Sequence, residues 1–254
     1  MSLRAFVRRP SSHLARGLVT HADRQGVDVE TALRQWEGYV QALHDAGWST
    51  IEVEPAHDCP DSVFVEDTVV MYGRLAVITR PGAPERRAET AGTEAAARAA
   101  GYRIGRIVEP GTLDGGDVLK CAGTVWVGEG GRTNAEGIRQ LAEHLEPLGA
   151  KIVAVPVSKV LHLKSAVTAL PDGTVIGYEP FLDDPAAFDP FLSVAEEAGS
   201  HVVLLENETV LMAASAPKTA ALLRERGYHV VMVDISEYEK LEGCVTCLSV
   251  RLRS

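Results

Sequence analysis

The feature that most limits the fold of this chain is a unit of two strands, a helix and a third strand that recurs along the sequence. In the clearest copy, apolar runs at 117–121 and 124–128 flank Ala122-Gly123, and a helical pattern at 133–148 precedes the apolar run 151–157. The unit recurs about four times, with predicted helices beginning roughly 30 to 50 residues apart, a spacing typical of repeat architectures.

Short apolar runs bounded by Gly, Pro and Asp predict the strands, and apolar residues spaced three or four apart predict the helices. Strands are expected at 5–8, 50–53, 62–71, 75–79, 102–108, 117–121, 124–128, 151–157, 165–170, 174–178, 201–205, 209–212, 228–233 and 246–252. Helices are expected at 27–46, 83–100, 133–148, 184–198 and 217–226. Strands and helices therefore alternate, which indicates an α/β fold.

The two ends of the chain complete this pattern. The first strand, 5–8, has no hairpin partner before its helix, and the last strand, 246–252, has none after it. Joined, the two ends would supply a fifth unit, and a ring closed in this way would leave few open sheet edges. An ordinary open α/β sheet is the alternative that the pattern leaves open.

Composition and charge exclude several classes of protein. The 254 residues are 46% hydrophobic and 24% charged, which is enough for a globular core. A formal net charge of -10 argues against general nucleic-acid binding, which requires basic patches. No apolar run approaches the ~20 residues of a membrane span, and the first residues lack the features of a signal peptide. The four cysteines show no disulfide framework, so we expect a reduced, cytoplasmic protein.

Two of the cysteines form the motif Cys244-Val-Thr-Cys247. A redox pair normally follows a strand at the start of a helix, whereas this pair leads into the terminal apolar run. A zinc site needs a second pair of ligands, and the sequence has no second motif of this kind. Two interpretations remain, a small core residue or a nucleophile, and Gly243 gives backbone room for a ligand to approach.

A nucleophilic cysteine needs a partner that handles protons. His162 lies between two predicted strands, within Val160-Leu-His-Leu-Lys164. An imidazole among Leu and Val is more often a buried structural residue than a catalyst. Its place at a junction between strands favours the catalytic interpretation, because catalytic groups concentrate in loops at the ends of elements.

Acidic residues gather in two segments. In Thr112-Leu-Asp-Gly-Gly-Asp117, two glycines let the backbone turn sharply and expose both carboxylates, although a simple turn before a hairpin has the same composition. In the predicted strand 62–71, Asp61, Val63, Val65 and Asp67 share one parity, while Glu66 faces the other side. Carboxylates at a strand end suit recognition of a cation, and a solvated strand end is the alternative.

Two arginines precede or open predicted helices. Arg86 lies at the start of the helix 83–100, and Arg132 stands just before Thr133, which with Glu136 resembles a capping box. Such arginines could hold a carboxylate, or they could be solvated.

Taken together, these residues resemble the dimethylarginine dimethylaminohydrolase family of the guanidine-modifying superfamily. The matching segments are PDSVFVED at 60–67, RPGAPERR at 80–87, TLDGGD at 112–117, GRTNAEG at 131–137, KVLHLKS at 159–165 and GCVTCLS at 243–249. They cover most of the chain in the order of the family. The resemblance implies a single catalytic domain, 1–254, with the pentein fold, a five-bladed α/β propeller of ββαβ units around a central active site.

The resemblance also implies the catalytic residues. Cys247 would attack the guanidinium carbon, His162 would protonate the leaving amine and then activate water, and Asp114 would support His162. Some members of the family carry Glu where this chain has Asp114. The expected reaction converts asymmetric dimethylarginine or monomethylarginine to citrulline and dimethylamine or methylamine through a covalent thiouronium on the cysteine.

The resemblance further implies the substrate-binding residues. Three acids would hold the guanidinium and the amino end of the substrate, two arginines would clamp its carboxylate, and a leucine would belong to a mobile lid. In that order they are Asp61, Glu66 and Asp67, Arg86 and Arg132, and Leu18. The expected partner is the small-molecule substrate, with no nucleic acid and no membrane, a homodimer is left open, and no metal or organic cofactor is required.

Two alternatives to this function stay open. Arginine deiminases share the cysteine, histidine and acid roles, but they are usually much longer and carry an inserted helical domain for which this chain has no room. Amidinotransferases are disfavoured by length as well. The alternative from another class is a non-catalytic zinc or redox module built on Cys244 and Cys247.

Overall fold

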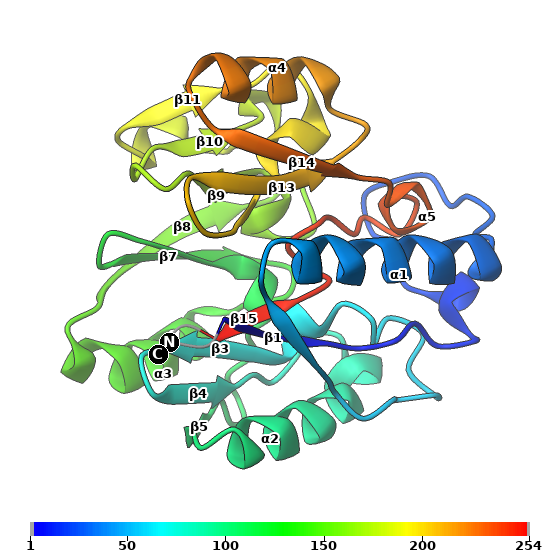
Figure 1. Cartoon of the computed structure of the whole chain (residues 1–254). Helices are drawn as coiled ribbons and strands as arrows, with labels where there is room; N and C mark the ends of the chain where they lie inside the picture. Colours follow the sequence, from blue (N-terminus) through cyan, green and yellow to red (C-terminus); the bar gives the residue numbers. More distant parts are fainter. Residues whose placement is uncertain (1–2, 253–254) are drawn as a thin grey trace.

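The computed structural model describes residues 3–252 and confirms that the two ends of the chain build one sheet. Strand β1 (Arg4–Val7) lies between β15 (Val250–Leu252) and β2 (Ser49–Glu52). It pairs antiparallel with β15 and parallel with β2, and Figure 1 shows β1 and β15 side by side. The first and last segments thus complete the fifth unit, as predicted.

The other four sheets repeat the same arrangement, a hairpin of two antiparallel strands whose second strand pairs parallel with a third. Their strands are β3 (Val69–Tyr72), β4 (Leu75–Ile78) and β5 (Arg103–Arg106); β6 (Val118–Cys121), β7 (Thr124–Gly130) and β8 (Lys151–Val157); β9 (Val167–Ala169), β10 (Val175–Gly177) and β11 (Phe191–Ser193); and β12 (Val203–Leu204), β13 (Thr209–Ala213) and β14 (His229–Val233). The chain therefore forms five small α/β blades, and the open single sheet is excluded.

Helices connect the second and third strands of four blades. They are α1 (Val29–Asp45), α2 (Thr90–Ala99), α3 (Ala135–Leu145) and α4 (Pro217–Glu225), and a short α5 (Ser236–Glu239) precedes the last strand. Figure 1 shows α1 and α2 on the outside of the sheets that they follow. Across residues 3–252, no helix is long and apolar enough to cross a membrane.

Helix α1 illustrates how the sequence sets these elements. The side chain of Asp28 accepts hydrogen bonds from the backbone N–H groups of Glu30 and Thr31 and so caps the first turn. Buried residues then recur along one face, among them Trp36 and Leu43. This apolar stripe packs against the core, which is where most helix stability in proteins originates.

The prediction of a helix over 184–198 is wrong. That segment contains a 3-10 turn, Pro185–Ala187, then strand β11, and then a second 3-10 turn, Glu197–Ser200. Pro190 would fall in the interior of this helix and lacks the N–H required there, which explains why a continuous helix does not form.

Two strands expected near the motifs are shorter than predicted. The run 62–71 contains a 3-10 helix, Val65–Thr68, and only β3 of that run is extended. Likewise, only Val250–Leu252 of the run 246–252 is a strand, so Cys247 lies in the turn before it. Both segments are largely buried, polar residues included, and a run buried on all sides gives no period by which a strand and a tight turn could be told apart.

Candidate active site

A small cavity brings together side chains from loops of several blades. Its volume is about 20 Å³, which is room for about one water molecule. Seven of the nine residues expected at the site line it, together with five that were not expected. The lining residues are Leu18, Asp61, Phe64, Asp67, Arg86, Arg132, Leu161, His162, Leu241, Glu242, Gly243 and Cys247.

Cys247 occupies the turn between α5 and β15 and is 7% exposed. Its N–H donates to the carbonyl of Cys244, and its sulfur lies 3.2 Å from the sulfur of Cys244. The hydrogen bond with Cys244 raises the pKa of Cys247, and burial and the charges of Glu66 and Asp67 raise it further. The same hydrogen bond lowers the pKa of Cys244. Without a cation beside it, Cys247 is therefore a thiol.

His162 and Asp114 form a buried pair behind the cavity. The Nε2 atom of His162 lies 2.9 Å from Oδ2 of Asp114, and Oδ1 of this fully buried carboxylate accepts a hydrogen bond from the N–H of Gly82. Thr133 donates its hydroxyl hydrogen to Asp117 and accepts the backbone N–H of Asp114 through the same oxygen. The contacts with Gly82, His162 and Thr133 fix the orientation of the Asp114 carboxylate.

The charges around His162 favour its protonated form. Burial by itself lowers the pKa of His162, but the charges of Asp67 and Asp117 and the hydrogen bond with Asp114 outweigh burial and raise it to about 9. The Nδ1 atom of His162 lies 3.8 Å from Oδ1 of Asp67. At neutral pH the imidazole therefore carries a proton that it can donate.

Asp67 is held as a carboxylate by Arg86. The two side chains form a buried ion pair at 2.6 Å, and Arg86 also binds Glu89 at 2.8 Å. Burial raises the pKa of Asp67, but the positive charges of His162 and Arg86 reverse this effect and lower it to about 2. Arg86 lines the cavity, yet most of its donors are directed at these acids and at the carbonyls of Asp61 and Phe64.

Arg132 is the other arginine of the cavity, and it is less tightly bound. Its closest carboxylate is Asp114, at 3.9 Å, and its NH2 group donates to the hydroxyl of Thr20 at 3.2 Å. The expected capping box at Thr133 is wrong by one residue, because Asn134 caps α3 and Thr133 binds Asp117 instead.

The loop that contains Leu18 contributes to the wall of the cavity. The N–H of Leu18 donates to both oxygens of Asp61, at 3.0 and 3.1 Å. A Cβ atom on Gly17 would lie 2.7 Å from an oxygen of Asp61, so this close approach requires glycine. Burial raises the pKa of Asp61.

Glu242 holds the same loop from the other side, and the sequence analysis missed it. Its carboxylate accepts the N–H groups of Thr20, His21 and Ala22 at 2.5, 2.7 and 3.1 Å. Glu242 has a φ of 59°, a left-handed conformation that non-glycine residues rarely adopt. Its position beside Gly243 and Cys244 in the motif was the only available signal, since a backbone-binding carboxylate leaves no pattern in the sequence.

Two further residues of the acidic motif have structural tasks. The carboxylate of Asp117 accepts the N–H of Leu163 and so fixes the segment that carries His162. A Cβ atom on Gly116 would lie 2.6 Å from the imidazole of His162, and the N–H of Gly116 donates to Asp67. Both Asp117 and Gly116 belong to TLDGGD, so the motif itself was the signal for them.

The structure places Glu66 outside the cavity of Cys247. Its carboxylate pairs with Lys164 at 2.5 Å and accepts the hydroxyl of Thr246 at 2.9 Å, beside a neighbouring cavity. Successive residues of a 3-10 helix diverge by about 120°, so Glu66 and its neighbour Asp67 point to different sides. The substrate contact of Glu66 was implied by the resemblance and stays a prediction, and the expected divergence of Glu66 from Asp67 is observed although the strand is replaced by a 3-10 helix.

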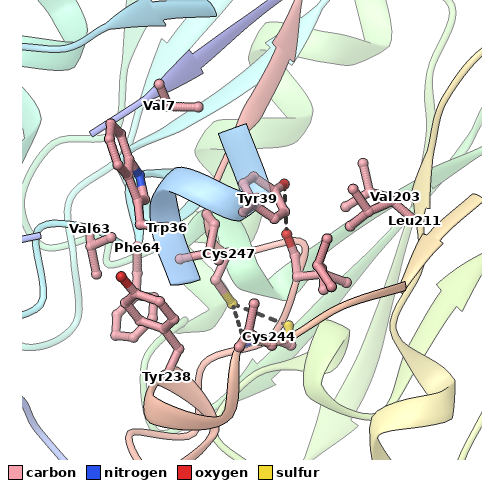
Figure 2. Packing of buried hydrophobic residues seen from close by; sticks show 14 of the residues in the cluster. Val7, Trp36, Tyr39, Val63, Phe64, Val203, Leu211, Tyr238, Cys244 and Cys247 are labelled. Atoms are coloured by element: carbon pink, nitrogen blue, oxygen red, sulfur yellow. Dashed lines mark hydrogen bonds between the residues drawn. The ribbon is translucent and has the colours of Figure 1, made fainter. Parts of the chain in front are cut away.

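Gly243 gives room for a close approach, as expected, but the group that approaches it is the side chain of Phe64 and not a ligand. A Cβ atom there would lie 2.3 Å from the ring of Phe64, which packs edge to face against Tyr238. Figure 2 shows Phe64 and Tyr238 next to the turn of Cys247. The glycine therefore lets the aromatic wall of the cavity reach the turn that carries the cysteine.

One cluster of the described residues has the composition of a metal site. Ligand atoms of Asp67, Asp114 and His162 lie within 4.8 Å of one another. The ion pair of Asp67 with Arg86 and the hydrogen bond between Asp114 and His162 already engage these groups. The cluster is therefore explained without a metal, as a protonated imidazole of His162 held between the carboxylates of Asp67 and Asp114.

Known proteins share both the sequence and the fold. A family model described as arginine deiminase matches residues 49–191. The N(G),N(G)-dimethylarginine dimethylaminohydrolase of Streptomyces coelicolor is 65% identical over 99% of this chain and 98% of that protein. The protein of the same name from Pseudomonas aeruginosa is 37% identical over 97% of this chain and 98% of its own length.

A solved structure of the Pseudomonas aeruginosa enzyme superimposes closely on this chain. It is a variant with a cysteine replaced by serine, complexed with citrulline, and it has a TM-score of 0.92 at 35% identity, covering 99% of this chain and 100% of that chain. Five small three-stranded sheets, four of them with a connecting helix, together with a buried cysteine, histidine and aspartate, place the chain in the pentein class of guanidine-modifying enzymes. Within that class, the chain belongs to the dimethylarginine dimethylaminohydrolase family, as its motifs predicted.

Proposed function

We propose that this protein hydrolyses asymmetric dimethylarginine and monomethylarginine to citrulline, releasing dimethylamine or methylamine. The observation that carries the proposal is one cavity lined by Cys247, protonated His162 and the ionised Asp67, with Asp114 hydrogen-bonded to His162. The names of its relatives support the same reaction, since two curated relatives that align with nearly the whole chain are dimethylarginine dimethylaminohydrolases.

Substrate recognition follows from the charges of the cavity. A guanidinium is a cation, and Asp67 offers a carboxylate whose low pKa keeps it ionised. We assign the amino end of the substrate to Asp61 and its carboxylate to Arg132, which is the arginine with the weaker internal contacts. Arg86 then positions Asp67, and closure of the loop at Leu18 excludes water.

The first half of the reaction forms a covalent intermediate. The substrate cation lowers the raised pKa of Cys247, so the thiolate forms as the guanidinium carbon arrives. Attack of the sulfur on that carbon gives a tetrahedral centre. His162 gives its proton to the nitrogen that carries the methyl groups, and the carbon–nitrogen bond breaks. The amine departs, and a thiouronium remains on Cys247.

The second half releases citrulline. His162, now neutral, takes a proton from a water molecule that attacks the thiouronium carbon. The carbon–sulfur bond then breaks, citrulline leaves, and the thiolate and the imidazolium are restored. Asp114 holds the imidazole in one orientation through both steps. Two steps with low barriers replace one difficult hydrolysis.

The test is the release of citrulline from arginine, monomethylarginine and asymmetric dimethylarginine by one preparation. We expect kcat/KM to be highest for the methylated substrates. Arginine deiminase is the second candidate, because a family model of that description matches residues 49–191. Faster release of ammonia from plain arginine would favour that candidate and overturn our assignment.

A reduced, cytoplasmic location is also part of the proposal. All four cysteines, Cys59, Cys121, Cys244 and Cys247, are free, and the proposed chemistry requires that Cys247 remain a thiol.

A further inference from the structure

The two cysteines of the terminal motif lie closer together than the proposed hydrolysis requires. Their sulfur atoms are 3.2 Å apart, and both residues are buried, with Cys244 at 3% exposure. Figure 2 shows the two thiols directed toward one another within the buried cluster that also contains Tyr39 and Phe64. Only Cys247 lines the catalytic cavity, so Cys244 has no contact with a substrate there.

The backbone between these cysteines is compatible with a disulfide. The N–H of Cys247 donates to the carbonyl of Cys244 at 3.1 Å, which closes a tight turn across Val245 and Thr246. The Cα atoms at the ends of such a turn lie less than about 7 Å apart, which overlaps the range found across disulfides. The sulfurs need to approach by only about 1 Å to reach bonding distance.

A zinc site is a poorer explanation of the pair. Zinc in a structural site takes four ligands. Among residues 3–252, the one cluster with the composition of a metal site contains Asp67, Asp114 and His162 and neither cysteine of the motif. Cys59 and Cys121 do not join Cys244 and Cys247 in the buried cluster around the motif. The nearest reactive partner of Cys247 is thus another thiol.

The surroundings make Cys244 suited to attack an oxidised Cys247. The hydrogen bond with Cys247 lowers the pKa of Cys244 well below its usual value, burial opposes this, and the charge of His201 favours the thiolate. A thiolate is the form that attacks an oxidised sulfur. The sulfur of Cys244 lies 3.2 Å from the hydroxyl oxygen of Thr246.

We propose that Cys244 and Cys247 form a reversible, hydroperoxide-sensitive pair in which Cys244 is the resolving thiol. The reactivity of Cys247 in this proposal rests on its proposed role as nucleophile. The proton that the two sulfurs share moves from Cys247 to Cys244, and the thiolate of Cys247 then attacks the hydroperoxide. The oxygen–oxygen bond breaks, Cys247 becomes a sulfenic acid, and the hydroxide that leaves takes the proton of Cys244 to become water. The thiolate of Cys244 then attacks that sulfur, a sulfur–sulfur bond forms, and the sulfenic oxygen leaves as hydroxide, which takes a proton to become water.

The electrons and atoms of this sequence balance. Two thiols lose two protons and two electrons, and one hydrogen peroxide becomes two molecules of water. A dithiol reductant returns the two electrons and restores both thiols. The disulfide removes the nucleophile and stops hydrolysis, while it protects Cys247 from sulfinic acid, which thiols do not reduce.

The test treats the reduced enzyme with hydrogen peroxide and follows three readouts. These are citrulline release, its recovery with dithiothreitol, and the mass of the peptide that contains Cys244 and Cys247. We expect activity to be lost, the peptide to lose two hydrogens without gaining oxygen, and dithiothreitol to restore activity. In Cys244→Ser we expect citrulline release within about threefold of the parent before treatment, and a fraction recoverable by dithiothreitol that is about tenfold smaller after it. Cys121→Ser is the matched control and should behave like the parent.

The outcomes separate this proposal from the proposed function. Oxygen on Cys247 with no disulfide in the parent protein would overturn the resolving role, and so would full recovery in Cys244→Ser. The mass measurement on the parent needs no variant, so it decides even where Cys244→Ser fails to fold. An absence of citrulline release from the reduced parent would instead count against the hydrolase assignment, whatever the peptide mass shows.

Discussion

Oδ2 of Asp114 lies 2.9 Å from Nε2 of His162, although 48 positions separate the two residues in the sequence. This contact joins the blade of β6–β8 to the loop that leads into β9. The carboxylate is one of three that hold the imidazole protonated, with Asp67 and Asp117. The contact therefore connects the packing of the loops around this blade to the acid–base chemistry of the site.

Replacing the carboxylate of Asp114 should change the pH dependence of the reaction. Burial alone lowers the pKa of His162, and acidic neighbours raise it to about 9, so His162 is protonated below that pH and loses its proton above it. In Asp114→Asn we expect kcat to fall roughly 100-fold and its decline at high pH to begin at a lower pH than in the parent. Asp114→Glu keeps the charge and should retain the pH profile of the parent. Identical pH profiles for Asp114→Asn and the parent would refute the role of Asp114 in keeping His162 protonated.

Replacing Cys247 should separate chemistry from folding. In Cys247→Ser the hydroxyl remains protonated at neutral pH, so we expect citrulline release to fall by about 10⁴-fold or more. Circular dichroism and the thermal midpoint should stay close to those of the parent, because the two side chains are similar in size. Substantial residual activity in a well-folded variant would contradict the assignment of the nucleophile.

Two neighbouring acids should respond differently to loss of charge. Glu66→Gln leaves the ammonium of Lys164, which is largely shielded from solvent, without its partner, so the free energy of unfolding should fall by about 3 kcal/mol, measured by urea denaturation. Its kcat/KM should stay within about tenfold of the parent, whereas Asp67→Asn should lower kcat/KM by roughly 100-fold. An equal loss of activity in both variants would show that Glu66 also contributes to substrate binding.

Removing the carboxylate of Glu242 should loosen the loop over the cavity. Glu242→Ala deletes the acceptor of three backbone N–H groups, so we expect KM to rise and trypsin to cleave the loop at Arg24 several-fold faster. Glu208→Ala is the matched control, because Glu208 is exposed and has the same left-handed backbone, with a φ of 55°. Equal cleavage in the two variants would show that Glu242 does not restrain the loop.

Neutralising Arg132 should weaken binding of the substrate's carboxylate. In Arg132→Gln we expect KM for methylated arginine to rise about 10- to 100-fold, since charged hydrogen bonds to a carboxylate are strong. A methylated substrate analogue without the carboxylate should have the same KM with parent and variant. A rise in KM for both substrates would place the role of Arg132 elsewhere, for example in its contact with Thr20.

The recurring unit was predictable because hairpin turns and apolar runs are local signals. The turn at Gly73, for example, has a φ of 51°, a conformation that glycine adopts readily. The 3-10 helix at Val65–Thr68 was not predictable in this way, because its residues are buried on every side and show no period. That error concerned the element alone, because a strand and a 3-10 helix both direct Glu66 and Asp67 to different sides.

By itself, the sequence determined the order of the strands and helices apart from 184–198, suggested that its two ends join, and contained the motifs of Cys247, His162 and Asp114. Only the tertiary structure decided which acids face the cysteine, that Arg86 holds Asp67, and that Glu242 closes the loop. The reason is physical. Strands and turns arise from interactions between neighbours in the chain, whereas a site built from loops of separate blades depends on how those blades pack.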